Sequence, residues 1–251
     1  MSIDDGARTW AAGGNDLVGM PPAAPLADLA ATADMSDFEF ALVEPQTSAV
    51  AFAGKRVIDI AIAFLTMLLL APVMVLVSVG IKLTSRGPVF FRQDRVGKDG
   101  VLFLLYKFRT MRDGAHQRIW NDPQHRAMYV AGDFKLPSNS SEITSLGRWL
   151  RCRSLDELPQ LINVLLGDMS VVGVRPLLEP ELALRPMIDQ RLYATMRPGM
   201  TGLWQVEGRS RLTKVTRVGL DRQYIEDWSL LSDVAILMRT PAAVFRHQDT
   251  R

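Results

Sequence analysis

The dominant pattern in the chain is an almost wholly apolar run from Ile60 to Ile81, broken only by Thr66, Pro72, Ser78 and Gly80. A run of 22 residues is long enough to cross a bilayer as a helix, which takes about 20 residues. Pro72 lies near its middle, where it removes one backbone hydrogen bond and clashes with the carbonyl of Leu68. The pattern therefore predicts a membrane helix that is kinked at Pro72.

The charges that flank this run do not specify how the helix is oriented in the membrane. Lys55 and Arg56 precede it, while Lys82 and Arg86 follow it, so the positive-inside rule places both ends in the cytoplasm. A re-entrant helix that bends at Pro72 and leaves by the same face satisfies both ends. A single-pass anchor and a buried core helix are the two alternatives, and the run is long for a core helix.

Shorter patterns follow the apolar run. Residues that favour strands flank the turn-forming segment 95–100, which predicts a β-hairpin ending near Phe108. Residues 112–140 are polar and irregular, so we expect a short helix and a loop there, and helical spacing returns in 142–152 and 159–166.

In the last third of the chain, the segment 197–202 predicts a turn or loop, because it contains Pro198, Gly199 and Gly202. A charged helix is expected over 212–227. Residues 230–245 have apolar positions at helical spacing, with a break expected at Pro241. That segment is either an amphipathic helix in the membrane interface or an ordinary core helix.

Charge is distributed unevenly along the chain. Residues 1–50 hold eight acids and one base, a net charge of −7, whereas the remainder holds 28 bases and 19 acids, a net charge of +9. The first segment is also rich in Ala, Gly and Pro without a sustained period, so we expect a disordered acidic tail. A cationic body favours anionic partners such as phosphates or anionic lipids.

Several classes of protein are disfavoured by what the sequence lacks. The single cysteine, Cys152, excludes an internal disulfide, and the three histidines have no zinc-ligand spacing. Neither a P-loop nor a dinucleotide-binding glycine motif occurs. No nucleic-acid-binding motif is present either, so we expect no nucleic-acid partner.

The densest chemistry is the segment 147–160, in which Arg148, Arg151 and Arg153 precede the adjacent acids Asp156 and Glu157. Carboxylates beside cations are suited to Mg²⁺ and phosphates, since Mg²⁺ takes carboxylate oxygens together with substrate phosphates. Neighbouring arginines would also keep Asp156 ionised, as a carboxylate nucleophile requires.

A capping box at Ser154 and a solvated charge cluster are the plainer interpretations of this segment. Pro159 disfavours the capping box, because it would then be the fifth residue of the helix. We therefore expect the helix to start at Pro159, with Asp156 and Glu157 in the connection before it.

Taken together, these segments resemble the bacterial sugar transferases, the monotopic polyprenyl-phosphate phosphoglycosyl transferases. The resemblance covers residues 53–247, and its matching blocks are Lys55-Arg56 with Asp59, Gly87 to Phe91 continuing to Gln93, Arg95 and Gly97, Tyr106 to Met111, Ser154 to Leu161, Asn163-Val164, Gly167 to Ser170, Gly173, Arg175-Pro176-Leu177, and Arg197 to Arg209.

The resemblance implies a fold and a division of the chain. The expected fold is α+β and mostly helical, with a re-entrant proline-broken helix, a β-hairpin and interfacial amphipathic helices. The expected parts are a disordered acidic tail over residues 1–52, a re-entrant membrane helix over 53–86, and a catalytic domain over 87–251 on the cytoplasmic face of the bacterial inner membrane.

The resemblance also implies an activity. Such enzymes move a sugar 1-phosphate from a UDP-sugar to undecaprenyl phosphate and release UMP, at the start of exopolysaccharide or other glycan assembly. Asp156 matches the family's nucleophile and is also expected to bind Mg²⁺, and Glu157 matches the second acid. The matching cations that would hold phosphates are Lys107, Arg151, Arg175 and Arg197.

The implied partners are a UDP-sugar, undecaprenyl phosphate and membrane lipids, and a homo-oligomer stays open. The short tail and the Gly-Leu-Trp-Gln block are similar to members that act on hexoses such as galactose or glucose. Two positions depart from the family pattern: Ala71 stands where Ser is common before the membrane proline, and Val174 where Pro is common before Arg175. A membrane-anchored scaffold without catalysis is the alternative from another class.

Overall fold

The structure is a computed structural model that describes residues 49–132, 136–137 and 139–246. Most of the predicted acidic tail, residues 1–48, lies outside the described residues. Ala49–Phe52, which were assigned to that tail, form the first turn of a helix.

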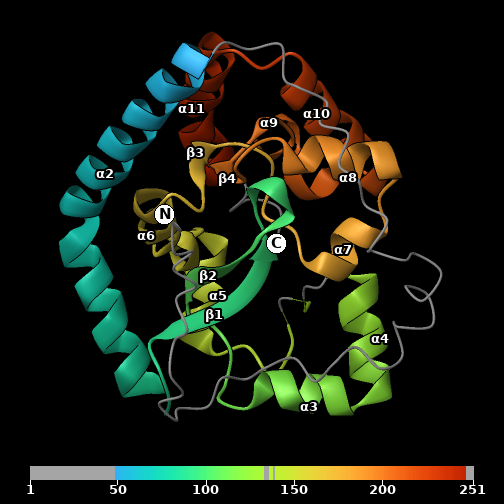
Figure 1. Cartoon of the computed structure of the whole chain (residues 1–251). Coiled ribbons are helices and arrows are strands. Elements are labelled where there is room, and N and C mark those ends of the chain that lie inside the picture. The colour runs from blue at the N-terminus through green and yellow to red at the C-terminus, as the bar shows by residue number, and fades with distance from the viewer. Residues whose placement is uncertain (1–48, 133–135, 138, 247–251) are drawn as a thin grey trace, which may run out of the picture.

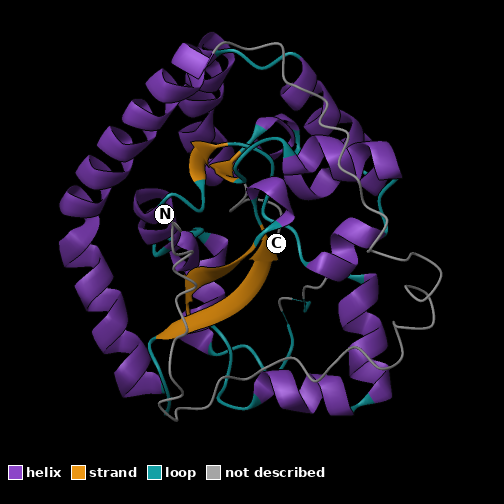
Figure 2. Cartoon of the chain, in the orientation of Figure 1, coloured by secondary structure: helices purple, strands orange, loops and turns teal. Residues whose placement is uncertain are grey.

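The described chain is mostly helical, with a small β-hairpin near its centre (Figure 2). The helices, shown in Figure 1, are α2 (Ala49–Thr84), α3 (Ala115–Asn121), α4 (Pro123–Ala131), α5 (Ser145–Cys152), α6 (Gln160–Leu166), α7 (Glu179–Ala183), α8 (Met187–Ala194), α9 (Leu203–Glu207), α10 (Lys214–Glu226) and α11 (Leu230–Arg246). The strands are β1 (Phe90–Val96), β2 (Leu102–Phe108), β3 (Ser170–Val172) and β4 (Gly199–Thr201). Short 3-10 turns are η2 (Lys98–Gly100), η3 (Leu155–Glu157) and η4 (Arg209–Arg211).

Helix α2 runs along one side of the molecule in a curved path (Figure 1). The helix is not interrupted at Pro72, so the expected proline-broken helix is one continuous helix here, and the kink at Pro72 stays a prediction. Its 36 residues would measure about 54 Å if straight, well beyond the roughly 30 Å of a bilayer's hydrocarbon core. Among the described residues, α2 is the one helix whose length and composition would allow it to cross a membrane.

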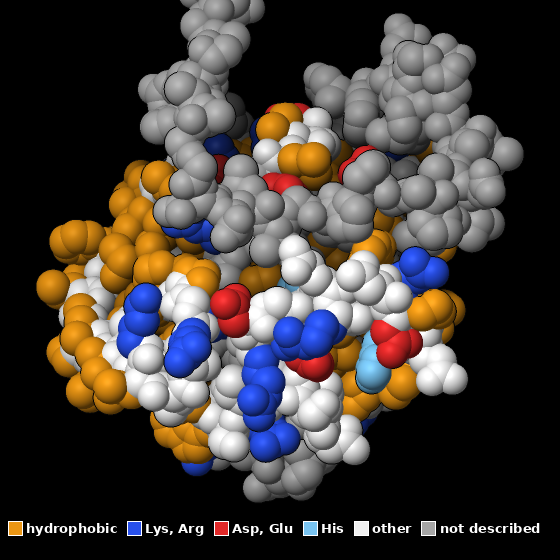
Figure 3. Space-filling model, turned by 90° about the horizontal axis from the view of Figure 1, so that it is seen from below, with side chains coloured by type: hydrophobic (Ala, Val, Ile, Leu, Met, Phe, Trp, Pro, Cys, Tyr) orange, Lys and Arg blue, Asp and Glu red, His pale blue; other side chains and the backbone are white. Residues whose placement is uncertain are grey.

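One face of α2 is buried against the body, and the opposite face is apolar and exposed, whereas the exposed face of a helix in a soluble protein is usually polar. The face toward the body buries Lys55 and Asp59 together with Ala63, Val77 and Ile81. The opposite face exposes large apolar side chains: Phe64, Leu65, Leu68, Leu69, Val75 and Leu76. Seen from below, hydrophobic side chains cover the edge of the molecule on which α2 lies (Figure 3). A contiguous exposed apolar surface of this kind is typical of an interaction with a membrane or a partner.

The predicted hairpin is confirmed. Strands β1 and β2 pair antiparallel, with Phe90 opposite Phe108 and Val96 opposite Leu102. The turn between them places Asp99 and Gly100 in the left-handed region, at φ values of 58° and 73°. Asp and Gly tolerate that conformation better than other residues, which explains why the chain reverses there.

The helices predicted over 142–152, 159–166 and 212–227 are confirmed as α5, α6 and α10. The prediction for 112–140 was incomplete, because this segment contains two helices. Asp122 caps the second of them, α4, by accepting hydrogen bonds from the backbone N–H groups of Gln124 and His125. Pro123 occupies the first helical position, where its missing N–H costs nothing.

Two further predictions need correction. Segment 197–202 is not only a loop, since Gly199–Thr201 forms β4 and pairs in parallel with β3. The backbones of Gly173 and Gly199 can approach this closely because neither residue has a side chain: a Cβ on Gly199 would lie 2.0 Å from the backbone nitrogen of Gly173. The helix α11 also continues through Pro241, and the hydroxyl of Thr240 donates to the carbonyl of Ile236 one turn earlier.

The main core lies between α2, α6, the two small sheets, α8, α10 and α11. Helix α6 is central to it, and its Leu161 and Val164 are almost fully buried. Asn163 fixes this helix against β2, because its amide donates to the carbonyl of Leu104 and accepts from the N–H of Tyr106. The chain just before α6 is therefore held beside the hairpin.

Candidate functional site

The adjacent acids Asp156 and Glu157 lie in η3, between α5 and α6. Ser154 has φ 55° and its side chain caps no helix, which argues against the capping box. Pro159 is the N-cap of α6, so the predicted start of this helix is confirmed to within one residue. The acids thus belong to a tight turn and not to a regular helix.

Glu157 faces the hairpin. The ammonium group of Lys107, on β2, donates to a carboxylate oxygen of Glu157 at 2.8 Å. The Lys107 side chain is 23% exposed and that of Glu157 is 38% exposed, so the pair remains open to solvent on one side. Two residues that are 50 positions apart in sequence are brought together here by the packing of α6 against β2.

Asp156 is buried, with 9% of its surface exposed. Burial raises the pKa of its carboxyl above the usual value, and the neighbouring Glu157 adds to the rise, while Lys107 and Arg151 oppose it. Burial therefore outweighs the nearby cations in setting this pKa, contrary to the expectation that the arginines would dominate. A cation bound beside the two carboxylates would lower the pKa of Asp156.

Of the three arginines that precede the acids, Arg151 is the one that interacts with Asp156. Arg151 donates to the hydroxyl of Thr110 at 2.9 Å and acts electrostatically on Asp156. The guanidinium of Arg153 instead stacks over the ring of Trp149, at 4.5 Å from its centroid.

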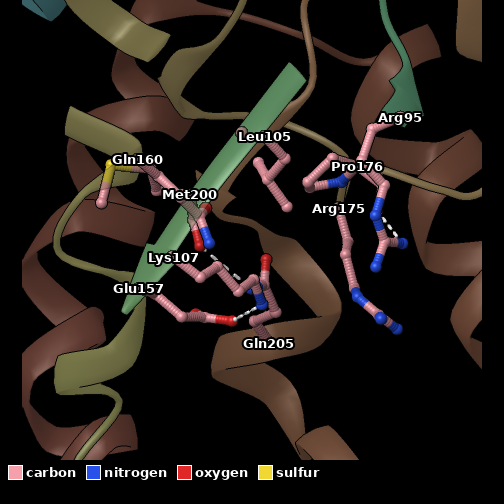
Figure 4. Close-up of a pocket in the computed structure, with 10 residues that line it drawn as sticks. Arg95, Leu105, Lys107, Glu157, Gln160, Arg175, Pro176, Met200 and Gln205 are labelled. Atoms are coloured by element: carbon pink, nitrogen blue, oxygen red, sulfur yellow. Dashed lines mark hydrogen bonds and ion pairs between the residues drawn. The ribbon is translucent and has the colours of Figure 1, made fainter. Parts of the chain in front are cut away.

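A pocket opens beside the Lys107–Glu157 pair. Figure 4 shows this pair on one side of the pocket and Arg95 and Arg175 on the other. The lining residues are Arg95, Leu105, Lys107, Glu157, Gln160, Arg175, Pro176, Gly199, Met200 and Gln205. Polar and cationic side chains thus lie beside η3, the turn that contains the buried Asp156.

The predicted cations occupy different places relative to this pocket. Lys107 and Arg175 line it, whereas Arg151 is not among the lining residues and acts electrostatically on Asp156. Arg197 is exposed, donates to the carbonyl of Gly167 at 2.6 Å, and is not among the lining residues. Its phosphate-binding role stays a prediction.

Three polar lining residues, Arg95, Gln160 and Gln205, were not among the predicted site residues. Each lies within a block that the family resemblance uses, but nothing in the sequence shows which side chain of a block faces a pocket. Arg95 is an example: it is on β1, it is 5% exposed, and it donates to the carbonyl of Pro176. The pairing of the hairpin with the segment after β3 turns it toward the site.

The carboxylate oxygens of Asp156 and Glu157 are candidate ligands for a metal ion. No group of three or more His, Cys, Asp or Glu side chains that could hold a metal occurs in the described part of the chain. Mg²⁺ does not require such a cage, because it is usually bound by one or two carboxylates together with phosphates and water. Asp156 and Glu157, which repel each other, fit this mode of binding.

The chain belongs to the bacterial sugar transferase family, which it matches over residues 50–247. It is 43% identical over 197 residues to the undecaprenyl-phosphate galactose phosphotransferase of Salmonella typhimurium, covering 76% of this chain and 40% of that protein. It is 38% identical over 194 residues to the exopolysaccharide production protein ExoY of Sinorhizobium fredii, covering 76% and 85%. The UDP-glucose:undecaprenyl-phosphate glucose-1-phosphate transferase of Caulobacter vibrioides is 42% identical over 195 residues, covering 74% and 67%.

The match therefore spans less than half of the Salmonella protein but most of ExoY. It includes every candidate site residue described above.

Proposed function

We propose that this chain transfers a hexose 1-phosphate from a UDP-sugar to undecaprenyl phosphate, giving undecaprenyl-diphosphate-sugar and UMP as the first step of exopolysaccharide or other glycan assembly. The observation that carries the proposal is the buried Asp156 beside a basic pocket, on a chain with one long exposed apolar helix. The printed names of the relatives support the substrate class.

The proposed reaction has two displacements. First, a carboxylate oxygen of Asp156 attacks the β-phosphorus of the UDP-sugar, an O–P bond to the enzyme forms, and UMP leaves with the electrons of the broken P–O bond. Next, an oxygen of the lipid phosphate attacks the same phosphorus and the aspartate is released. A covalent intermediate of this kind predicts ping-pong kinetics.

The cations of the site would neutralise the phosphates during both steps. Phosphoryl transfer is catalysed mainly by positioning and by stabilising charge, which requires preorganised positive groups. Lys107 and Arg175 line the pocket and would contact the diphosphate, while Arg151 lies near Asp156. In this proposal Lys107 exchanges its contact with Glu157 for one with a phosphate oxygen.

Mg²⁺ would be held by Asp156, with Glu157 next to it, and by the phosphates of the substrate. When bound, it supplies positive charge that offsets the phosphate oxygens. That charge would also lower the pKa of Asp156, which burial and Glu157 raise in the chain alone.

The direct test is UMP release by detergent-purified protein with undecaprenyl phosphate, Mg²⁺ and a panel of UDP-sugars. We expect release with at least one UDP-hexose, and we expect it to be lost when either Mg²⁺ or the lipid is omitted. Folded protein that releases no UMP from any UDP-sugar would contradict the proposed activity and favour a membrane-anchored scaffold.

We further propose that the chain is monotopic, with the body on the cytoplasmic face of the inner membrane. The outward apolar face of α2 would enter the bilayer, while its body-facing Lys55 and Asp59 stay bound to the body. The cationic flanks at both ends of the apolar run support a helix that enters and leaves by one face.

This topology predicts that tags attached at residue 1 and at residue 251 are both protected from membrane-impermeant reagents in intact cells. Both tags should react after the cells are permeabilised, which serves as the control. Labelling of the N-terminal tag in intact cells would instead identify a single-pass protein.

A further inference from the structure

Gln205 places an unpartnered acceptor at the candidate site. It lies on α9 and lines the pocket (Figure 4). Its amide nitrogen donates to the carbonyl of Met200 at 3.1 Å, which fixes the orientation of the amide group. Its Oε1 is then buried, and no described residue donates a hydrogen bond to it.

The backbone around Gln205 leaves room for this oxygen. A Cβ on Gly202 would lie 3.0 Å from Oε1 and 2.3 Å from the carbonyl oxygen of Gly173. Glycine at position 202 therefore allows the oxygen to sit where it does. A buried acceptor without a partner costs free energy, so a ligand that donates a hydrogen bond would bind there favourably.

A second unpartnered polar atom belongs to the same pocket. Arg95 is buried, and two of its guanidinium nitrogens donate to the carbonyl of Pro176 and to the side chain of Gln93. Its Nε is buried, and no described group accepts its hydrogen bond. Two residues that line the pocket thus each hold a buried polar atom without a described partner, one acceptor and one donor, and they share the lining with Lys107 and Arg175, whose charges suit phosphate oxygens.

A sugar hydroxyl suits this combination because it both donates and accepts. Gln205 lines the pocket together with Glu157, the residue next to Asp156. In the proposed reaction the β-phosphorus meets Asp156, and the group attached to that phosphate is the hexose. The uridine is one phosphate further away, so the hexose is the part of the donor that lies nearest to Gln205.

We propose that Gln205 accepts a hydrogen bond from a hydroxyl of the donor's hexose and thereby favours donors that carry this hydroxyl. The inference rests on the function proposed above and adds to it a residue that recognises the sugar through a hydrogen bond. A site built to bind a hydroxyl rejects an analogue that lacks it, because its own polar group is then left unpaired.

The test combines a change in the protein with changes in the substrate, as in a double-mutant cycle. The four UDP-sugars that lack the 2-, 3-, 4- or 6-hydroxyl are compared with the parent UDP-hexose, by kcat/KM, in the wild type and in Gln205→Met. We expect one analogue to react about tenfold less well than the parent in the wild type, and this penalty to vanish in Gln205→Met.

Gln190→Met is the matched control, because Gln190 also donates its amide to a backbone carbonyl, that of Arg185, but it does not line the pocket. This variant should keep the full penalty. Inhibition by UMP, which has no hexose, should have the same constant in the wild type and in Gln205→Met. A tenfold weaker inhibition by UMP with an unchanged analogue penalty would assign Gln205 to the uridine and overturn the proposal.

Wild-type protein that treats all four analogues like the parent would also overturn it, whether or not the variants fold. Wild-type protein that is inactive with every UDP-sugar would contradict the proposed function itself. The two failures are therefore distinguishable.

Discussion

Asp156→Asn is expected to reduce UMP release at least about a thousandfold, because the amide oxygen is a poor nucleophile toward phosphorus. The fold should tolerate the change, since Asn has the shape of Asp and removes a carboxyl whose ionisation burial and Glu157 disfavour. The reaction is followed as UMP release with the best UDP-sugar, and separately as sugar phosphate bound to the protein when the lipid is omitted.

The second readout separates the nucleophile from a residue that only supports catalysis. Wild-type protein should retain close to one labelled sugar phosphate per active site in the absence of undecaprenyl phosphate, whereas Asp156→Asn should retain none. Asp227→Asn is the matched control, because Asp227 is exposed at the end of α10, and it should behave like the wild type. Normal labelling of Asp156→Asn would exclude Asp156 as the nucleophile.

The position of the acids could be predicted from the sequence because local rules determine it. Pro159 strongly prefers the start of a helix, so the residues just before it had to lie in a connection. The hairpin was equally accessible, since strand-forming residues flank an obvious turn. Both features bring Lys107 and Glu157 within reach of each other once Asn163 joins α6 to β2.

The features that escaped prediction depend on tertiary contacts. Strands β3 and β4 have three residues each and no alternation, and their pairing relies on the close approach of Gly173 and Gly199. The rise in the pKa of Asp156 depends on how deeply the turn is buried. The role of Gln205 depends on which of its two amide atoms the carbonyl of Met200 engages.

Helix α2 is attached to the body by a buried polar network that the sequence motif alone does not reveal. Lys55 donates to the carbonyl of Val172 at 3.0 Å and forms an ion pair with Asp233 on α11. The side chains of both partners are 8% exposed. Asp233 also accepts hydrogen bonds from the hydroxyl of Tyr224 and the indole nitrogen of Trp228. Helix α2, β3, α10 and α11 therefore meet at the Lys55–Asp233 pair.

Lys55→Met is expected to lower the free energy of unfolding by about 3–5 kcal/mol, because it leaves the charge of Asp233 buried without its counterion. For a chain of this size the melting temperature should fall on the order of 10 °C. Thermal unfolding in detergent measures the effect. Lys82→Met, the same substitution at an exposed position of α2, should change the melting temperature little.

A second substitution shows whether the loss arises from the buried charge or from the missing lysine stem. In Lys55→Met/Asp233→Asn the charge of Asp233 is gone, while the amide oxygen can still accept from Tyr224, so part of the stability should return; the carboxyl of Asp59, 3.9 Å from the ammonium of Lys55, still lacks that partner. If the double variant melts no higher than Lys55→Met, the lost packing of the stem is responsible instead. Recovery would mean that the unpaired charge of Asp233, and not the lost packing of the lysine stem, accounts for most of the lost stability. Lys55 also donates to the carbonyl of Val172, three residues before Arg175, so the lysine joins α2 and α11 to the strand that precedes this lining residue of the pocket.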